Sequence, residues 1–266
     1  MNRIDETFSR KSRTNSKTLV MFLPAGDPDL ATSAELIKNI ADAGADIIEV
    51  GVPFSDPTAD GPTIQAASQR ALRAGTTLPR IFEMIREVRK EISTPLILFG
   101  YYNVFFNYGL EAFARDARQA GVDGLLVVDL PPEEADEVYP ALEEHDLHLI
   151  PLLAPTTSSE RRHKVLRKAG GFIYYVSVTG VTGVRAAVPS DLAEHLKQIK
   201  SETALPTVAG FGVSTPDMAR EVVQYADGVV VGSALVKTIA EAESREAGLN
   251  SARQFVRSLA EAVSPG

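Results

Sequence analysis

The clearest hydrophobic pattern in this chain is a short apolar run that follows a glycine-containing joint, and it occurs four times. The apolar runs lie at 47–48, 125–128, 172–176 and 229–231. A glycine just past a helix supplies the left-handed residue that ends it, and a short apolar run after it is typical of a buried parallel strand. The pattern therefore predicts a repeating helix–strand unit.

Proline or glycine marks the other strands, and eight are predicted in all. They span 18–23, 46–51, 95–99, 123–129, 147–152, 172–177, 206–210 and 227–231. The clearest helix between them has apolar residues spaced three and four apart, which form one stripe: Leu78, Ile81, Ile85, Val88 and Ile92. Helix starts are predicted at 27–28, 131–133 and 214–216, where a capping side chain or a proline stands.

Eight strands that alternate with helices match the architecture of a closed parallel (β/α)₈ barrel, which takes roughly 250 residues. This α/β fold, with extra short helices, is the one we predict. An open doubly wound sheet is the structural alternative. No break in composition suggests a second domain, so residues 1–266 are predicted to form one catalytic domain.

The composition of the chain excludes several classes of function. The chain carries 27 Lys and Arg against 35 Asp and Glu, a formal net charge of −8, which argues against a basic surface for nucleic acid or a polybasic membrane anchor. It has no cysteine, which excludes disulfides and thiolate chemistry. Its apolar runs are shorter than the roughly 20 residues of a membrane helix. Residues 1–17 are polar and lack the apolar region of a signal peptide, so the expected location is the cytoplasm.

The first candidate for chemistry is Glu49, a carboxyl group inside an otherwise apolar strand. Active sites of parallel barrels lie at the carboxyl ends of the strands, and a partly desolvated carboxyl there has a raised pKa suited to proton transfer. The alternative is a structural glutamate that pairs with a cation or caps a loop. Asp60 follows on a proline- and aspartate-rich loop and is a second acid–base candidate, with a helix N-cap as its alternative role.

Three glycine loops follow the last three strands, at 180–183, 210–212 and 232–233. Each exposes backbone N–H groups that could hold a phosphate, and the last loop is predicted to open a helix whose dipole favours an anion. None matches a nucleoside-triphosphate loop, and no dinucleotide fingerprint follows the first strand.

The remaining candidates are less decisive. The four histidines, at 145, 148, 163 and 195, have no converging acidic ligand, so no metal site is predicted. Four aromatic residues could belong either to the core or to a ligand pocket: Phe22, Tyr101, Tyr174 and Phe211.

The motif at 49–65, EVGVPFSDPTADGPTIQ, strongly resembles the signature of the tryptophan synthase alpha chain family. Shorter motifs of that family occur in the same order across almost the whole chain: residues 25–28, 101–103, 129–131, 180–183, 210–212 and 232–233. The resemblance implies a (β/α)₈ barrel that cleaves indole-3-glycerol phosphate to indole and glyceraldehyde 3-phosphate, with no cofactor in this chain. It also implies a partner, a pyridoxal-phosphate-dependent beta chain, in an α2β2 complex.

Carried over position by position, the resemblance makes Glu49 the catalytic acid–base and Asp60 the second catalytic carboxylate. The substrate-binding positions are Phe22, Tyr174, Thr182 and Phe211. The phosphate-binding positions are Gly183, Gly212, Gly232 and Ser233. Two residues depart from the family pattern: Pro24 stands where Thr is more usual, and Thr58 replaces an apolar residue.

Three alternatives to this function remain at the level of sequence. The chain could be a free-standing lyase that releases indole without a beta chain. It could be another phosphate-sugar barrel enzyme, such as an isomerase. It could also be a catalytically weak chain that mainly activates a partner.

Overall fold

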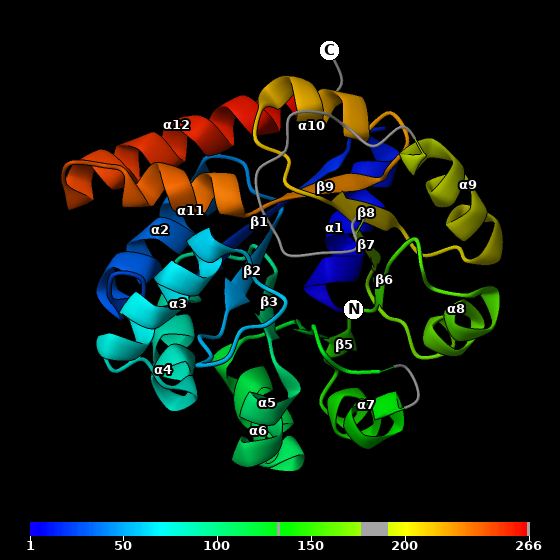
Figure 1. The fold of residues 1–266 in the computed structure, drawn as a ribbon, viewed down its shortest axis with the longest axis horizontal. Coiled ribbons are helices and arrows are strands. Elements are labelled where there is room, and N and C mark those ends of the chain that lie inside the picture. The colour runs from blue at the N-terminus through cyan, green and yellow to red at the C-terminus, as the bar shows by residue number, and fades with distance from the viewer. Residues whose placement is uncertain (132–133, 177–190, 265–266) are drawn as a thin grey trace.

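The computed structural model describes residues 1–131, 134–176 and 191–264. Within these ranges parallel strands form a central curled sheet that helices surround (Figure 1). The strands are β1 (Thr18–Pro24), β2 (Ile47–Gly51), β3 (Leu96–Gly100), β4 (Gly124–Val127), β5 (His148–Leu149), β6 (Leu152–Leu153), β7 (Ile173–Val176), β8 (Thr207–Gly210) and β9 (Gly228–Val231).

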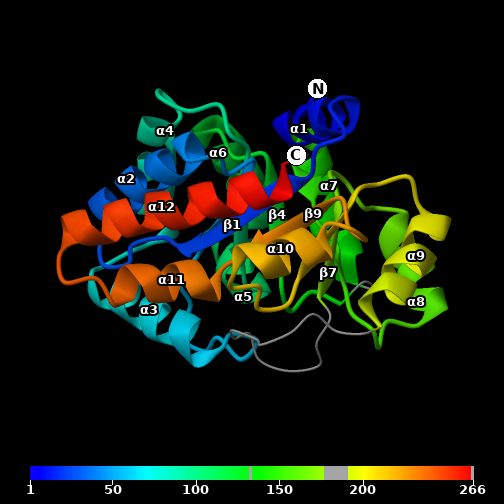
Figure 2. The same cartoon turned by 90° about the horizontal axis from the view of Figure 1, so that it is seen from above.

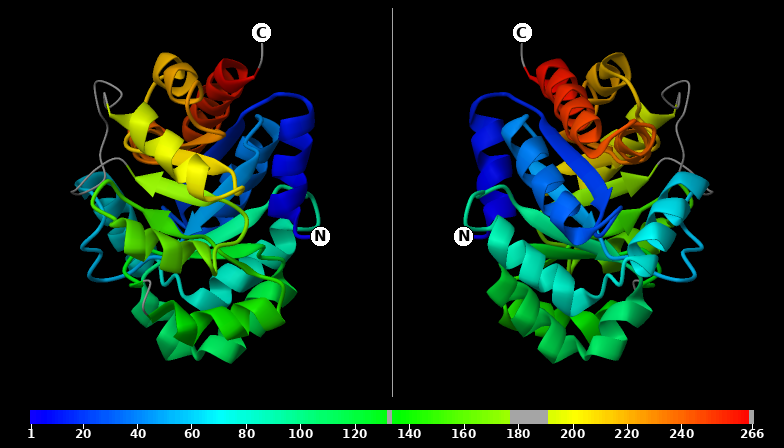
Figure 3. Two further views of the ribbon diagram at one scale, coloured as in Figure 1. Left: turned by 90° about the vertical axis from the view of Figure 1, so that its right-hand side faces the viewer. Right: turned by 90° about the vertical axis from the view of Figure 1, so that its left-hand side faces the viewer.

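The helices lie outside this sheet, as both side views show (Figure 3). They are α1 (Arg3–Arg13), α2 (Leu30–Asp42), α3 (Pro62–Arg73), α4 (Leu78–Val88), α5 (Tyr102–Tyr108), α6 (Leu110–Ala120), α7 (Ala135–Glu144), α8 (Ser159–Leu166), α9 (Leu192–Glu202), α10 (Pro216–Val222), α11 (Ser233–Ala240) and α12 (Arg245–Val263). None of these helices is long and apolar enough to cross a membrane.

The sheet closes into a barrel through one divided strand. Its order is β5-β4-β3-β2-β1-β9-β8-β7-β6, so the two edge strands follow each other in the chain. Between them, Ile150 donates its N–H to the carbonyl of Leu125 at 2.8 Å, and the carbonyl of Pro151 accepts from Tyr174 at 2.9 Å. The predicted strand 147–152 therefore occupies one position of an eight-position ring. It is divided at Pro151, which has no N–H for the ladder.

Alternate residues of the strands fill the barrel interior. One interior cluster is formed by Val20, Ile47, Ile97, Leu126, Ile150, Phe172, Tyr174, Val208 and Val230. Two residues of α1, Ile4 and Phe8, belong to the same cluster, so this helix closes the end where the strands begin (Figure 2). The sequence pattern did not predict α1, because its apolar positions amount to one short stripe in a polar segment.

The polar joints before the strands have a structural explanation. An aspartate in three of them accepts a hydrogen bond from the neighbouring strand position: Asp46 from the N–H of Leu19, Asp123 from Leu96 and Asp227 from Thr207, each at 2.9 Å. Each of these carboxylates also pairs with a lysine or an arginine. The joints thus fix the strands side by side at the amino end of the barrel.

The predicted helix starts are only partly correct. Thr215 caps α10 as predicted, and its hydroxyl accepts from the N–H of Met218 at 3.3 Å. At α2 the cap is Asp29 and not Asp27. Asp27 instead forms a two-point ion pair with Arg70, at 2.7 and 2.8 Å. The start predicted at 131–133 includes two residues outside the described ranges, and α7 begins after them at Ala135.

Candidate active site

Glu49 lies in the middle of β2, between Phe22 of β1 and Ile97 of β3 in the strand register. Its side chain is fully buried, and neither carboxyl oxygen has a hydrogen-bond partner among the described residues. Burial alone raises the pKa of this carboxyl to about 8. A group so placed holds its proton at neutral pH and can still release it, as a proton carrier must.

Two aromatic side chains share the interior with Glu49. Tyr174 is buried, and its hydroxyl pKa is raised by burial and then by the charge of Glu49, which places the two groups near each other. Phe22 packs edge-on against Phe99 with ring centroids 5.0 Å apart. The rings of Tyr174 and Phe22 therefore lie on the interior side of the sheet, where the resemblance placed substrate-binding residues.

Glycines provide the space for these two rings. A Cβ atom at Gly210 would come within 2.7 Å of the Tyr174 hydroxyl, and one at Gly51 within 2.7 Å of the Phe22 ring. Contacts this short do not occur in real structures, so a side chain at either position would displace the ring. A Cβ atom at Gly232 would lie 3.2 Å from Phe22, which is also a tight contact.

Asp60 lies at the end of the loop between β2 and α3 and is also buried. Burial raises its pKa to about 6, against a hydrogen bond with the Tyr101 hydroxyl that lowers it. The same hydroxyl accepts from the N–H of Ala59 at 3.0 Å. Asp60 is not the N-cap of α3, because Gly61 occupies that position. The alternative role considered for Asp60 is therefore wrong.

Tyr101 is one of the four aromatic residues that the sequence left undecided between core and pocket. It follows the carboxyl end of β3, and that position is the signal that favours a place near the site. Burial and then the charge of Asp60 raise the pKa of its hydroxyl, so this group stays a neutral donor at physiological pH. Tyr101 thus contacts both Asp60 and the loop that carries it.

The glycine loops are described in part. Gly212 has a φ of 85°, and Gly232 directly precedes α11, whose first residue is the buried Ser233. The backbone N–H groups at the start of this helix have no partners within the helix and suit an anion. The loop at 180–183, with Thr182 and Gly183, lies outside the described residues.

Phe211 belongs to a different cluster from Phe22 and Tyr174. It is buried in the large cluster that includes Ala209 of β8 and Val213, whereas Tyr174 belongs to the interior cluster and Phe22 to a small cluster with residues of α3 and α11.

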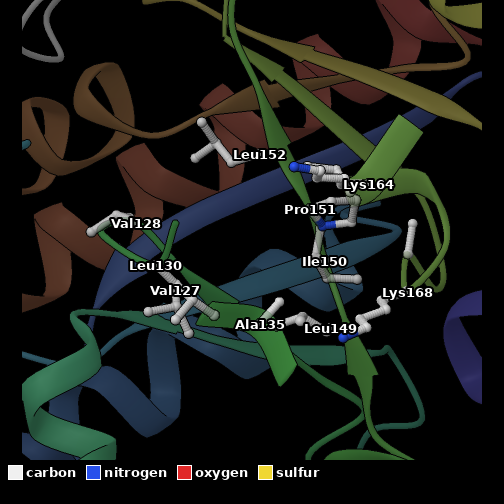
Figure 4. A pocket seen from close by; sticks show the side chains of 12 residues that line it. Val127, Val128, Leu130, Ala135, Leu149, Ile150, Pro151, Leu152, Lys164 and Lys168 are labelled. Atoms are coloured by element: carbon white, nitrogen blue, oxygen red, sulfur yellow. The ribbon is translucent and has the colours of Figure 1, made fainter. Parts of the chain in front are cut away.

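An apolar pocket of about 110 Å³ lies where the sheet divides between β4 and β6. Figure 4 shows Val127 and Val128 on one side of it and Leu152 on the other, with Lys164 and Lys168 nearby. Neither Glu49 nor Asp60 lines this pocket, so it is not the candidate catalytic centre.

The histidines contribute no catalytic geometry. His148 lies in β5, at the amino end of the barrel, and its ring is 2.9 Å from the carboxylate of Asp5. No cluster of three metal-ligating side chains occurs in the part of the chain that the structure describes.

A closed parallel barrel holds one buried carboxyl group that has no partner among the described residues, and a second buried carboxyl lies on an adjoining loop. This arrangement is typical of enzymes of the (β/α)₈-barrel class. The sequence matches the family model of the tryptophan synthase alpha chain over residues 8–264. The chain belongs to the tryptophan synthase alpha chain family.

Individual members of this family match the chain in sequence and structure over nearly their full lengths. The chain is 52% identical to the tryptophan synthase alpha chain of Geobacter sulfurreducens over 263 residues, which is 99% of each protein. The crystal structure of tryptophan synthase subunit alpha from Legionella pneumophila str. Paris is 40% identical with a TM-score of 0.92, and the match covers 99% of this chain and 98% of that one. A structure of Mycobacterium tuberculosis tryptophan synthase is 37% identical with a TM-score of 0.92, covering 100% and 99%.

The family determines the reaction. The chain is a carbon–carbon lyase that cleaves indole-3-glycerol phosphate in tryptophan biosynthesis, as an alpha subunit that forms a complex with a beta chain. The open-sheet alternative is wrong, because the sheet and its structural relatives are barrels. The free-standing lyase, the isomerase and the weak activating chain are not favoured.

Proposed function

We propose that Glu49 carries both protons of the cleavage and that Asp60 stabilises the charge that develops on the indole ring. The observation that supports this most is the state of Glu49: fully buried, with neither oxygen partnered by a described residue. A buried carboxyl without partners is unfavourable for stability, so a role in the reaction explains its presence better than a structural role does.

The reaction is a retro-aldol cleavage in two proton steps. Protonated Glu49 first gives its proton to the ring carbon that bears the glycerol side chain, and the ring nitrogen gains positive character. The Glu49 carboxylate then takes the proton of the side-chain hydroxyl. As the carbonyl of the aldehyde forms, the carbon–carbon bond breaks and its electrons return to the ring. Glu49 ends protonated, as it began, which agrees with its raised pKa.

Asp60 acts in its ionised form. With a pKa of about 6 it carries a negative charge at neutral pH, when Glu49 is still mostly protonated. A carboxylate that accepts from the ring N–H stabilises the developing positive charge. Two carboxyl groups with separated pKa values can therefore serve as acid and as counter-charge in one site.

The rest of the site binds and orients the substrate. Phe22 and Tyr174 line the interior beside Glu49, and Phe211, Thr182 and Gly183 remain substrate and phosphate positions from the family pattern. Gly212, Gly232 and Ser233 are proposed to hold the phosphate through backbone N–H groups and a hydroxyl. Binding energy at the phosphate then orients the distant bond that breaks. This chemistry requires no cofactor in this chain.

We further propose that the whole chain acts as one catalytic domain in the cytoplasm and forms an α2β2 complex. The proposed contact surface for the beta chain is the loop 52–60 together with α5. Phe106 of α5 is 55% exposed, which is unusual for a phenylalanine. The neighbouring Phe105, by contrast, is only 1% exposed and packs against Phe113. It therefore belongs to the core.

Replacing Glu49 with Gln tests the proposal directly. The amide has the same size but cannot exchange a proton in the same way, so turnover of indole-3-glycerol phosphate should fall by roughly 10²–10⁴-fold. The control is Glu83→Gln, an exposed carboxyl on α4. Near-normal turnover by a folded Glu49→Gln protein would remove Glu49 from the mechanism.

A further inference from the structure

A polar pocket of about 410 Å³ lies at the amino end of the barrel, opposite the proposed phosphate loops. It is bounded by the end of α1, the start of β1 and the connection from α9 to β8. The described residues that line it include neither Glu49 nor Asp60, nor Phe22, Tyr174 or Phe211. The lyase reaction gives this pocket no role.

Three lysines from separate segments converge on the pocket: Lys11, Lys17 and Lys200. Among the described residues that line the pocket, the only acidic one is Asp227. Lys11 is paired with Asp46, which lies outside the lining, at 2.7 Å, and Lys200 is paired with Asp227 at 2.8 Å. The other oxygen of Asp227 accepts from the N–H of Thr207 at 2.9 Å. The excess positive charge of the pocket therefore lies on Lys17.

Lys17 is the most constrained of the three. Its ammonium group donates to the carbonyl of Ala226 at 2.9 Å. Burial lowers its pKa, the charge of Asp227 raises it, and the nearby charge of Lys200 lowers it again. Two like charges thus face one partly buried space, an arrangement that an anion between them would stabilise. An ammonium group has three N–H donors, so each lysine can also bind a ligand.

Neutral polar residues complete the lining: Ser12, Asn15, Ser16 and Thr203. The carbonyls at the end of α1 do not repel an anion strongly, because the N–H groups of residues 14–16 cap them.

We propose that this pocket is a second anion site, which binds inorganic phosphate or a small phosphate ester between Lys17 and Lys200. A tetrahedral anion with several acceptor oxygens can bond to both ammonium groups together. The pocket is larger than one phosphate, so a small organic group can accompany it. This site is independent of the phosphate loops at the other end of the barrel.

The experiment is a titration of the full-length chain with inorganic phosphate at constant ionic strength, followed by amide NMR signals. Wild-type protein should show saturable shifts at residues 15–18 and 203–205, separate from shifts at 210–212 and 232–233. Lys17→Gln should weaken binding at the first set by about tenfold or more and leave the second set unchanged. Lys200→Gln, which removes the second ammonium group, should weaken binding at the same set.

Lys90→Gln is the matched control, because Lys90 is an exposed lysine that also pairs with a carboxylate, Glu87, and lies outside the pocket. It should bind phosphate like the wild type at both sets. Absence of saturable shifts at 15–18 and 203–205 in the wild-type protein would overturn the proposal. Equal affinity of Lys17→Gln, Lys200→Gln and Lys90→Gln at those residues would overturn it too. None of these results depends on turnover at Glu49, so failure here leaves the proposed function untouched.

Discussion

The hydroxyl of Tyr101 accepts a hydrogen bond from the backbone N–H of Ala59 at 3.0 Å. This contact joins the carboxyl end of β3 to the loop that carries Asp60. The ring of Tyr101 also stacks on Phe54 of the same loop, with centroids 5.1 Å apart. One side chain therefore holds the loop at two points and contacts the carboxyl group that the loop delivers.

Tyr101→Phe should keep the stacking and release the hydroxyl contacts. Asp60 would then be in place for a smaller part of the time, so kcat should fall by about tenfold while KM changes less. The hydrogen bond from Tyr101 lowers the pKa of Asp60, so its loss should move the acid limb of the pH–rate profile to higher pH. A merely structural role would not move that limb.

The control for this variant is Tyr108→Phe. Its hydroxyl also bonds a carboxylate, Asp116 at 2.7 Å, but on the outer side of the barrel between α5 and α6. It should leave both kcat and the pH profile unchanged. Equal behaviour of the two variants would contradict the positioning role of Tyr101.

The pH dependence of kcat/KM should be bell-shaped, with limits near pH 6 and pH 8. Asp60 must be ionised, so activity should fall as the pH drops through about 6. Glu49 must hold a proton to give to the ring carbon, so activity should fall as the pH rises through about 8. Steady-state rates from pH 5 to 9 measure both limbs, and Asp60→Asn should abolish the acid limb only. A profile with no basic limb would argue against a protonated Glu49 in the first step.

Glu49 should also make the stability of the protein depend on pH. Its pKa is about 8 in the fold against an ordinary value of 4.5, so the folded state binds the proton more tightly than the unfolded state does. The stabilisation of the folded state that results from this tighter binding is fully present below pH 4.5 and is lost as the pH rises to about 8. At 1.36 kcal/mol per pH unit, the loss amounts to about 3 kcal/mol between pH 5 and 8.

Urea unfolding of the wild type and of Glu49→Gln at several pH values measures this effect. The glutamine variant cannot ionise, so its stability relative to the wild type should rise by about 3 kcal/mol from pH 5 to 8. Any fixed penalty from the buried amide cancels in that comparison. A difference that is constant with pH would show that Glu49 does not titrate in the folded protein over this range.

The sequence could predict the parts of the fold that local pattern determines. Short apolar runs after glycine joints identified the strands, and the stripe that begins at Leu78 identified α4, although Ile92 lies beyond its end. The pattern could not predict the division of one strand at Pro151, because that division depends on which neighbour each half bonds. It also missed α1, which Ile4 and Phe8 hold against the barrel through contacts distant in sequence.

The candidate site also has parts that the sequence could predict and parts that it could not. Glu49 stands out in a sequence because a carboxyl group interrupts an apolar strand. The position of Tyr101 after a strand makes it a candidate, but the sequence does not show its contact with the Asp60 loop, because that contact depends on how the loop folds back over the end of β3. The aspartates of the joints resembled ordinary turn residues, and only the folded chain shows them bonding to adjacent strands.

The exposed ring of Phe106 should be a contact for the beta chain. Phe106→Ala removes an aromatic side chain that the fold leaves in solvent, so the isolated chain should keep its stability and its basal turnover. Aromatic residues at the centre of an interface often contribute 2 kcal/mol or more, so the affinity for a beta chain should fall by about tenfold or more. In the wild type, the beta chain should raise indole production and protect the loop 52–60 from proteolysis, because a docked partner orders the loop that carries Asp60. Tyr225→Ala is the control, because Tyr225 is also exposed, at 43%, but lies before β9 at the amino end of the barrel. Equal affinity of both variants for the beta chain would place the contact surface away from α5.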